Sequence, residues 1–217
     1  MMSGLSGHTA LFGGSFNPPH AGHVSAVRGL LKTPGVRRVK VVPSFGMPLK
    51  EASVSFEHRL AMTRVAFEGL AEVDGIEGEH RIGFTWQLLE ALKGRGEPLA
   101  FVMGSDQLES LPRWSRFPDV LRLCDWIVLG RKPGGLDRAE RAAATLVAGG
   151  ILTRTEAPGV YLTPGKGSSL RLCETEAPEL SSTRIREFLA LNQKESAGEL
   201  LPPGILDFIE RNKLYGT

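Results

Sequence analysis

The stretch GGSFNPPHAGH, residues 13–23, decides the fold that this sequence predicts. It follows Leu11 and Phe12, which end a short apolar run of the kind that forms a strand. The two glycines at its start let the backbone turn sharply and approach a ligand closely. The two prolines further on suit the first turn of a helix, where a missing backbone N–H costs little. The stretch therefore predicts a strand, a tight turn and then a helix over residues 20–31.

Two histidines lie at the beginning of that predicted helix. His20 and His23 are three residues apart, so they share one side of the helix, where Val24, Val27 and Leu31 form the expected apolar stripe. We expect both rings to point at the crevice above the strand ends, where open α/β sheets bind ligands. A helix N-terminus there carries free N–H groups that suit phosphate. The histidines could hold phosphate oxygens while charge develops on phosphorus, so the stretch predicts phosphate chemistry.

Two common phosphate-binding motifs are absent. The sequence GKGS at residues 165–168 looks like part of a P-loop, but the glycine five residues before Gly165 is missing. Gly167 also stands where the P-loop needs a serine or threonine for magnesium. The first turn lacks the GxGxxG pattern of dinucleotide-binding folds. The chemistry must therefore depend on a different motif.

Two blocks of the sequence resemble the signatures of the nucleotidyltransferase superfamily. HAGH at residues 20–23 resembles its HxGH signature, and SSTRIR at residues 181–186 resembles its (I)SSTxIR signature. Leu180 occupies the position where isoleucine is common. Members of this superfamily transfer a nucleoside monophosphate from ATP or CTP to a phosphate acceptor and release pyrophosphate. The resemblance implies that reaction class.

The fuller pattern at residues 13–23 resembles the bacterial nicotinate mononucleotide adenylyltransferase family. Segments at residues 43–50, 83–85 and 104–114 also resemble that family, so the likeness runs from about residue 10 to residue 188. Ser115 departs from it, because an aromatic residue is frequent there. Residues 132–178 depart as well, being longer and richer in glycine than the family leads us to expect.

The resemblance implies roles for individual residues. The implied catalytic residues are His20, His23 and Arg186. The implied ATP-binding residues are Gly13, Gly14, Ser15, Phe16, Gly104, Asp106, Arg131, Ser182 and Thr183. The implied acceptor-binding residues are Lys50, Thr85 and Trp114. Ordinary structural roles stay open for several of them: a helix cap for Thr85 or Ser182, a core position for Trp114 and a surface position for Lys50. Asn17 either satisfies the turn backbone or contacts the ligand.

The implied reaction joins ATP and nicotinate mononucleotide into deamido-NAD. The phosphate of the acceptor attacks the α-phosphorus of ATP, so positioning and charge stabilisation can supply most of the catalysis. Mg²⁺ is expected to arrive with ATP, because no protein side chains have metal-ligand spacing. Nicotinamide mononucleotide, phosphopantetheine or FMN remain alternative acceptors. A non-catalytic nucleotide-binding regulator on the same fold is the alternative from a different class.

The composition sets further limits. The chain has 217 residues, 41% of them hydrophobic, and a net charge of +2, so charge alone predicts no nucleic-acid partner. It has neither an N-terminal signal-peptide pattern nor an apolar run of membrane-spanning length. Cys124 and Cys173 form no metal-type spacing and are expected to be reduced, which favours a cytoplasmic protein. The sequence leaves open whether the protein forms a homo-oligomer.

Strand-like and helix-like segments alternate along the chain, which favours a mainly parallel sheet with helices on both faces. We therefore expect the α/β class, with residues 1–217 forming a single Rossmann-like, doubly wound domain. Expected strands cover residues 9–12, 38–42, 73–77, 99–103, 126–129 and 160–162. Expected helices cover residues 20–31, 56–70, 85–92, 138–146, 182–191 and 203–211, with a short turn or helix near 117–121. The lone histidines His8, His58 and His80 are expected at the surface.

Overall fold

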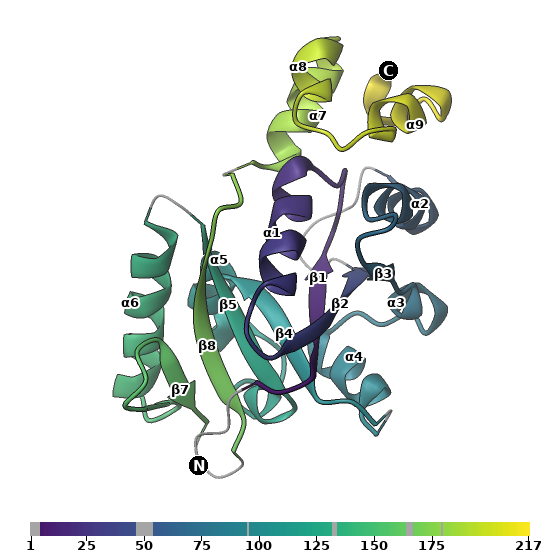
Figure 1. Ribbon diagram of the computed structural model, residues 1–217. Helices are drawn as coiled ribbons and strands as arrows, with labels where there is room; N and C mark the ends of the chain where they lie inside the picture. The colour runs from purple at the N-terminus through teal and green to yellow at the C-terminus, as the bar shows by residue number, and fades with distance from the viewer. Residues whose placement is uncertain (1–4, 47–53, 95, 132–133, 164–166, 179) are drawn as a thin grey trace.

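A computed structural model describes residues 5–46, 54–94, 96–131, 134–163, 167–178 and 180–217. Within these residues the strands form one eight-stranded sheet in the order β3-β2-β1-β4-β5-β8-β7-β6 (Figure 1). The strands are β1 (His8–Gly14), β2 (Val36–Pro43), β3 (Glu72–Val73), β4 (Leu99–Gly104), β5 (Asp125–Arg131), β6 (Thr153–Arg154), β7 (Val160–Leu162) and β8 (Ser169–Thr175). From β3 to β8 all neighbours pair in parallel, whereas β6 and β7 are antiparallel additions at one edge.

The sheet changes its winding direction between β1 and β4. The chain winds outward from β1 through β2 to β3, then returns to the other side of β1 and winds outward again from β4. In open parallel sheets, ligands bind outside the carboxyl ends of the strands at such a switch point. Here β1 ends at Gly14 and β4 ends at Gly104, so these two strand ends flank the expected site.

Helices cover both faces of the sheet. In β4, Ala100 and Val102 belong to one apolar cluster, while Phe101 and Met103 belong to the other. The first cluster packs against α1 (Ala21–Leu31), and the second packs against α4 (Thr85–Leu92), α5 (Ser105–Ser110) and α6 (Gly135–Ala148). Strands apolar on both faces are typical of parallel sheets. The structure therefore confirms the predicted α/β, doubly wound class.

A third apolar cluster joins the last helices to α2 (Phe56–Ala66). Met62 of α2 packs there with Ile185 and Ile209. Figure 1 shows these last helices stacked beyond the start of α1. The helices concerned are α7 (Ser182–Ala190), α8 (Lys194–Gly198), α9 (Ile205–Arg211) and the 3₁₀ turn η3 (Leu214–Gly216). Among the described residues, none of the helices combines the length and apolar character needed to cross a membrane.

One strand prediction was wrong, and two strands were not predicted. The strand expected over residues 73–77 covers only Glu72–Val73, and the chain then forms α3 (Ile76–Glu79). Asp74 begins that turn by accepting the Ile76 N–H at 3.0 Å, a local bond that competes with strand pairing. The strands β6 and β8 were not predicted, because the glycine-rich composition of residues 132–178 was given more weight than the alternation of polar and apolar residues along β8.

Helix boundaries and some packing predictions also need correction. Helix α2 ends at Ala66 rather than at residue 70. Along α1, the buried residues include Ala26, Val27 and Leu30, whereas Leu31, which was expected in the apolar stripe, is 38% exposed. His8 is buried, with its Nε2 2.8 Å from the Asp125 carboxylate, so this histidine is a paired core residue rather than a surface one.

The contact between β5 and α6 generates a stability prediction. A methyl group on Gly130 would stand 2.6 Å from the Leu136 backbone nitrogen, and backbone atoms cannot rotate away. Gly130→Ala should therefore lower the free energy of unfolding by about 1–3 kcal/mol in urea denaturation. The matched control is Gly29→Ala, exposed in α1, where added helix propensity should raise stability by about 0.5–1 kcal/mol. Equal stability of Gly130→Ala and the wild type would contradict the described packing.

Candidate active site

The turn between β1 and α1 lies at the switch point of the sheet. We call residues 15–19 the β1–α1 turn. Phe16 has a positive φ of 47° and is completely buried, packed edge-on against Phe67 and His23. A side chain on Gly14 would approach the Phe16 ring to 3.0 Å, so the bare backbone of Gly14 lets that ring pack beneath the turn. Phe16 can therefore meet a ligand only through its backbone.

The two signature histidines are stacked face to face. The ring centroids of His20 and His23 are 3.6 Å apart, with 22° between the ring planes. The backbone N–H of His20 donates to Nδ1 of His23 at 3.1 Å. Because Nδ1 accepts that bond, a neutral His23 carries its proton on Nε2. Gly22 makes the stack possible, since a side chain there would lie 3.1 Å from the His20 ring.

Both histidines are held in the neutral form. Burial lowers the pKa of His20 to about 4, with a further contribution from the positive charge of Arg131. Burial also holds the pKa of His23 well below its usual range, helped by His20 and Arg131. Two stacked rings could not both carry charge without strong repulsion. At neutral pH each ring therefore offers one N–H donor and no net charge, while Arg131, exposed at the end of β5, supplies positive charge nearby.

The second signature block docks onto the β1–α1 turn. Ser182 donates through Oγ to the carbonyl oxygen of Pro18 at 2.9 Å. Arg186 donates through Nη1 to the carbonyl oxygen of Asn17 at 2.7 Å and through Nη2 to Thr183 Oγ1 at 3.3 Å. Thr183 is exposed in the first turn of α7. The residues joined by the two bonds to carbonyl oxygens are 164 and 169 positions apart in the sequence. These long-range bonds bring the two motifs into contact.

A buried arginine that sequence reasoning missed joins the ends of two strands. Arg59 is 1% exposed, and its Nη1 donates to the carbonyl oxygens of Ser15 and Ser44 at 2.8 Å each. Burial lowers the pKa of this guanidinium. An arginine in an amphipathic helix is normally solvated, so no sequence signal distinguishes Arg59 from its exposed neighbours. It fixes the ends of β1 and β2 beside the switch point.

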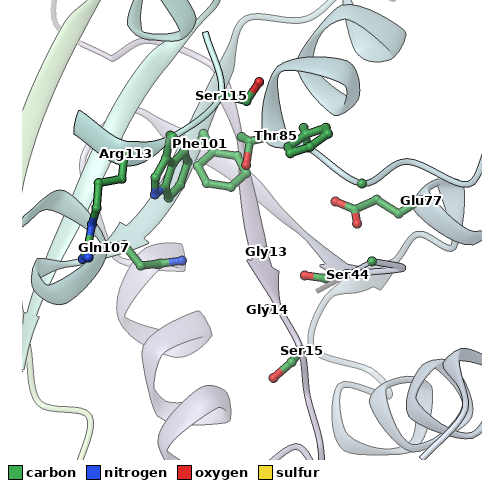
Figure 2. Close-up of a pocket in the computed structure, with 14 residues that line it drawn as sticks. Gly13, Gly14, Ser15, Ser44, Glu77, Thr85, Phe101, Gln107, Arg113 and Ser115 are labelled. Carbon is green, nitrogen blue, oxygen red and sulfur yellow. The ribbon is translucent and has the colours of Figure 1, made fainter. Parts of the chain in front are cut away.

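A cavity of about 450 Å³ opens beside Gly13 and Gly14 (Figure 2). Two predicted acceptor-binding residues line it: Thr85, in the first turn of α4, and Trp114, packed edge-on against Phe101 at 6.3 Å. The third, Lys50, lies outside the described residues. The lining residues are Gly13, Gly14, Ser15, Ser44, Gly46, Glu77, Gly83, Phe84, Thr85, Phe101, Gln107, Arg113, Trp114 and Ser115.

The remaining predicted ATP residues lie at the ends of the neighbouring strands. Asp106 folds back over Gly104, so that a side chain on this glycine would meet the Asp106 carboxylate at 2.5 Å. The Gly104 N–H donates to Gln107 Oε1 at 2.9 Å. Gly104 is the last residue of β4, and Asp106 lies in the first turn of α5. Neither is among the described residues that line the cavity. Within the described part of the chain, no three His, Cys, Asp or Glu side chains are grouped to hold a metal.

Glu77 is a second residue that sequence reasoning missed. It belongs to α3, in a segment predicted as a strand, and its carboxyl group points into the cavity in Figure 2. Only 9% of the residue is exposed, and the carboxylate accepts the Phe45 N–H at 2.9 Å. Burial raises the pKa of Glu77 to about 7, although that hydrogen bond and the charge of Arg59 oppose the rise. A buried carboxyl that titrates near neutrality is typical of functional sites.

Known proteins are similar to this chain over most of its length. The cytidylyltransferase-like family model matches residues 11–188. A probable nicotinate-nucleotide adenylyltransferase from Serratia proteamaculans is 32% identical over 221 residues, covering 95% of this chain and 94% of that protein. A protein of the same description from Anaeromyxobacter dehalogenans is 32% identical over 214 residues, covering 95% of each.

Solved structures share the fold at much lower sequence identity. A nicotinic acid mononucleotide adenylyltransferase from Plasmodium falciparum, complexed with NaAD, aligns with a TM-score of 0.73 at 18% identity, covering 96% of this chain and 97% of that one. The same enzyme complexed with APC aligns with a TM-score of 0.69 at 19% identity, covering 96% of each chain.

The buried carboxyl group generates a pH prediction. Between about pH 4.5 and pH 7 the folded protein holds a proton on Glu77 that the unfolded chain has released. The contribution of Glu77 to the free energy of unfolding therefore falls by about 3 kcal/mol as pH rises through this window. The lowered pKa values of His20 and His23 act in the opposite direction over part of it, so the contribution of Glu77 is measured as the difference between a variant and the wild type. Glu77→Gln keeps an oxygen for the Phe45 N–H and removes the titration. Denaturation at pH 5, 6, 7 and 8 should show the variant gaining stability over the wild type as pH rises.

Glu79→Gln is the matched control for this measurement. Glu79 belongs to the same short helix but is exposed, so its variant should follow the wild-type pH dependence. Parallel stability curves for Glu77→Gln and the wild type would mean that Glu77 is ionised throughout this range.

Proposed function

This chain belongs to the nicotinate-nucleotide adenylyltransferase family of cytidylyltransferase-like proteins, and we propose that it transfers AMP from ATP to nicotinate mononucleotide. The products are deamido-NAD and pyrophosphate. The observation that carries the proposal is the docking of the two signature blocks, in which Ser182 and Arg186 hydrogen-bond to the β1–α1 turn. Both blocks are intact, and the hydrogen bonds bring them to one end of the sheet.

The proposed reaction is an in-line displacement at phosphorus. An oxygen of the acceptor phosphate forms a bond to the α-phosphorus of ATP while the bond from that phosphorus to the bridging oxygen breaks. The electron pair leaves on pyrophosphate. Because the attacking oxygen is already anionic, no side chain has to remove a proton. The protein contributes by aligning the two phosphates and by stabilising the charge that develops between them.

In this proposal the histidine pair binds the phosphates of ATP. Neutral His20 and His23 donate hydrogen bonds without competing for a proton from the acceptor, and His23 does so through Nε2. Donors that are already positioned stabilise developing charge without reorganising during the reaction. The backbone N–H groups of Gly13, Gly14, Ser15 and Phe16 lie beside them at the end of β1.

The triphosphate would extend from the histidines toward α7. The first turn of this nine-residue helix carries Ser182 and Thr183, whose backbone N–H groups have no partner within the helix. Arg186 and Arg131 supply positive charge on either side. Gly104 and Asp106, at the switch point, are placed for the ribose of the nucleotide. Mg²⁺ would arrive bound to the phosphates of ATP and neutralise the leaving pyrophosphate.

The cavity beside Gly13 would hold the acceptor. Trp114 offers an aromatic face on which a pyridine ring can stack. Thr85 offers its hydroxyl and the N–H groups at the start of α4 to the ring carboxylate. Lys50 would approach from outside the described residues. Ser115 lines the same cavity without the aromatic ring that is frequent at this position, so the acceptor must be tested directly.

We further propose that residues 1–217 act as one domain, because the third apolar cluster fastens the last helices to α2. A reaction that consumes ATP and yields a dinucleotide suits the cytoplasm, and Cys124 and Cys173 are free thiols. The activity needs no nucleic-acid or membrane partner, and a homo-oligomer would be compatible with it.

Pyrophosphate release in the presence of ATP and Mg²⁺ tests the proposed function. Nicotinate mononucleotide, nicotinamide mononucleotide and phosphopantetheine should be compared at equal concentration. We expect the highest kcat/KM with the nicotinate form, because helix-start N–H groups and Lys50 favour a carboxylate over a neutral amide. Faster release with another acceptor would preserve the chemistry and overturn the proposed acceptor. Release with none of them would overturn the enzymatic proposal.

His20→Ala tests the role of the histidine pair. Loss of one preorganised donor should lower kcat by about 100- to 1000-fold, while circular dichroism shows an unchanged fold. The matched control is His80→Ala, since His80 is exposed after α3 and should change kcat by less than about twofold. If His20→Ala turned over at the wild-type rate, the phosphates could not depend on this ring.

A further inference from the structure

The β1–α1 turn is held by hydrogen bonds to its own carbonyl oxygens. Arg59 binds the Ser15 oxygen, Arg186 binds the Asn17 oxygen, and Ser182 binds the Pro18 oxygen. A carbonyl oxygen that accepts a bond from a cation directs its negative end at that cation and away from an anionic ligand. Three donors from α2 and α7 therefore fix the backbone that is proposed to face the phosphates of ATP.

A fourth donor comes from the end of the chain. The hydroxyl of Tyr215 donates to Asn17 Oδ1 at 2.6 Å, across 198 residues of sequence. Asn17 is only 6% exposed, so this bond lies within the packed interior of the turn. Tyr215 thus holds the side chain of the same residue whose backbone oxygen Arg186 holds.

The backbone around Tyr215 is in a sparsely populated conformation. Lys213, Tyr215 and Gly216 have φ angles of 50°, 60° and 85°. Non-glycine residues adopt such angles only where the surrounding structure imposes them, and such positions cluster at functional sites. On this turn, Leu214 is buried in the third apolar cluster and Tyr215 bonds to Asn17, so the segment is held at two adjacent residues.

The electrostatic surroundings keep this hydroxyl a donor. Burial raises the pKa of Tyr215 above its usual value, although the nearby charges of Arg186 and Arg59 oppose the rise. The hydroxyl is therefore protonated at neutral pH and can donate to Asn17 Oδ1.

We propose that Tyr215 is a positioning residue for the adenylyl transfer, which acts through Asn17 to hold the β1–α1 turn in the shape that binds ATP. The inference rests on the proposed function of this site. It assigns the C-terminal turn η3, which contributes no residue to the cavity, a role in the ATP half of the reaction.

Tyr215→Phe removes the hydroxyl and keeps the ring. The matched control is Tyr161→Phe, because this other tyrosine is buried in β7, near the far edge of the sheet, whereas Tyr215 is half-buried beside the β1–α1 turn. Loss of a buried hydrogen bond leaves Asn17 Oδ1 without this donor, so kcat/KM for ATP should fall at least about fivefold. KM for the acceptor should change by less than about twofold, since neither Tyr215 nor Asn17 is among the residues that line the acceptor cavity. Tyr161→Phe should leave both quantities unchanged.

Comparing the effect of the variant on ATP with its effect on the acceptor distinguishes a positioning role from a loss of stability. Suppose that in Tyr215→Phe kcat/KM falls by the same factor for ATP and for the acceptor, and that the melting temperature falls as well. This result would show that Tyr215 only supports the fold. Unchanged kcat/KM for ATP would also overturn the proposal.

ATP binding measured by calorimetry keeps this test separate from the proposed function. If the wild type binds ATP but transfers AMP to no acceptor, the proposed function fails while the comparison of ATP affinity between wild type and Tyr215→Phe still decides the role of Tyr215. A weaker affinity in the variant supports the proposal, and an equal affinity overturns it.

Discussion

The structure depends on how the carbonyl oxygens of one short turn are satisfied. A turn that is to bind phosphate must present its N–H groups, yet its carbonyl oxygens need partners as well. Here Arg59, Ser182 and Arg186 supply those partners from two helices that are distant in sequence. Helix α7 therefore has a structural role at this end of the sheet, because two of its side chains hold the backbone of the β1–α1 turn.

Charge is distributed around the site so that the central donors are neutral. Burial holds His20 and His23 uncharged, while Arg131 and Arg186 carry the positive charge at the edge. Two neutral rings can stack at 3.6 Å, which two imidazolium rings could not do. The result is a fixed set of hydrogen-bond donors surrounded by cations, an arrangement suited to a transition state with spread negative charge.

Much of the fold and part of the site could be predicted from local sequence. The glycine turn, the histidine pair and the start of α4 at Thr85 follow from short-range rules on turns and helix starts, and the structure has these elements where they were expected. The alternation of polar and apolar residues along β8 is itself typical of a strand, but the glycine-rich composition of residues 132–178 was given more weight, so this strand was not predicted. Segment 73–77 failed because the side chain of Asp74 redirects the backbone, an effect that apolar periodicity does not register.

By itself, the sequence determined the chemistry of this protein, because the motifs at residues 13–23 and 181–186 each carry their functional groups within a single turn and helix start. Only the tertiary structure decided how the two motifs meet. It placed Ser182 against Pro18, buried Arg59 and Glu77 beside the switch point, and brought Tyr215 to Asn17. The physical reason is that burial and long-range hydrogen bonds arise from the packing of the whole sheet and its helices. The sequence around a single arginine, glutamate or tyrosine does not indicate whether its side chain is exposed or buried.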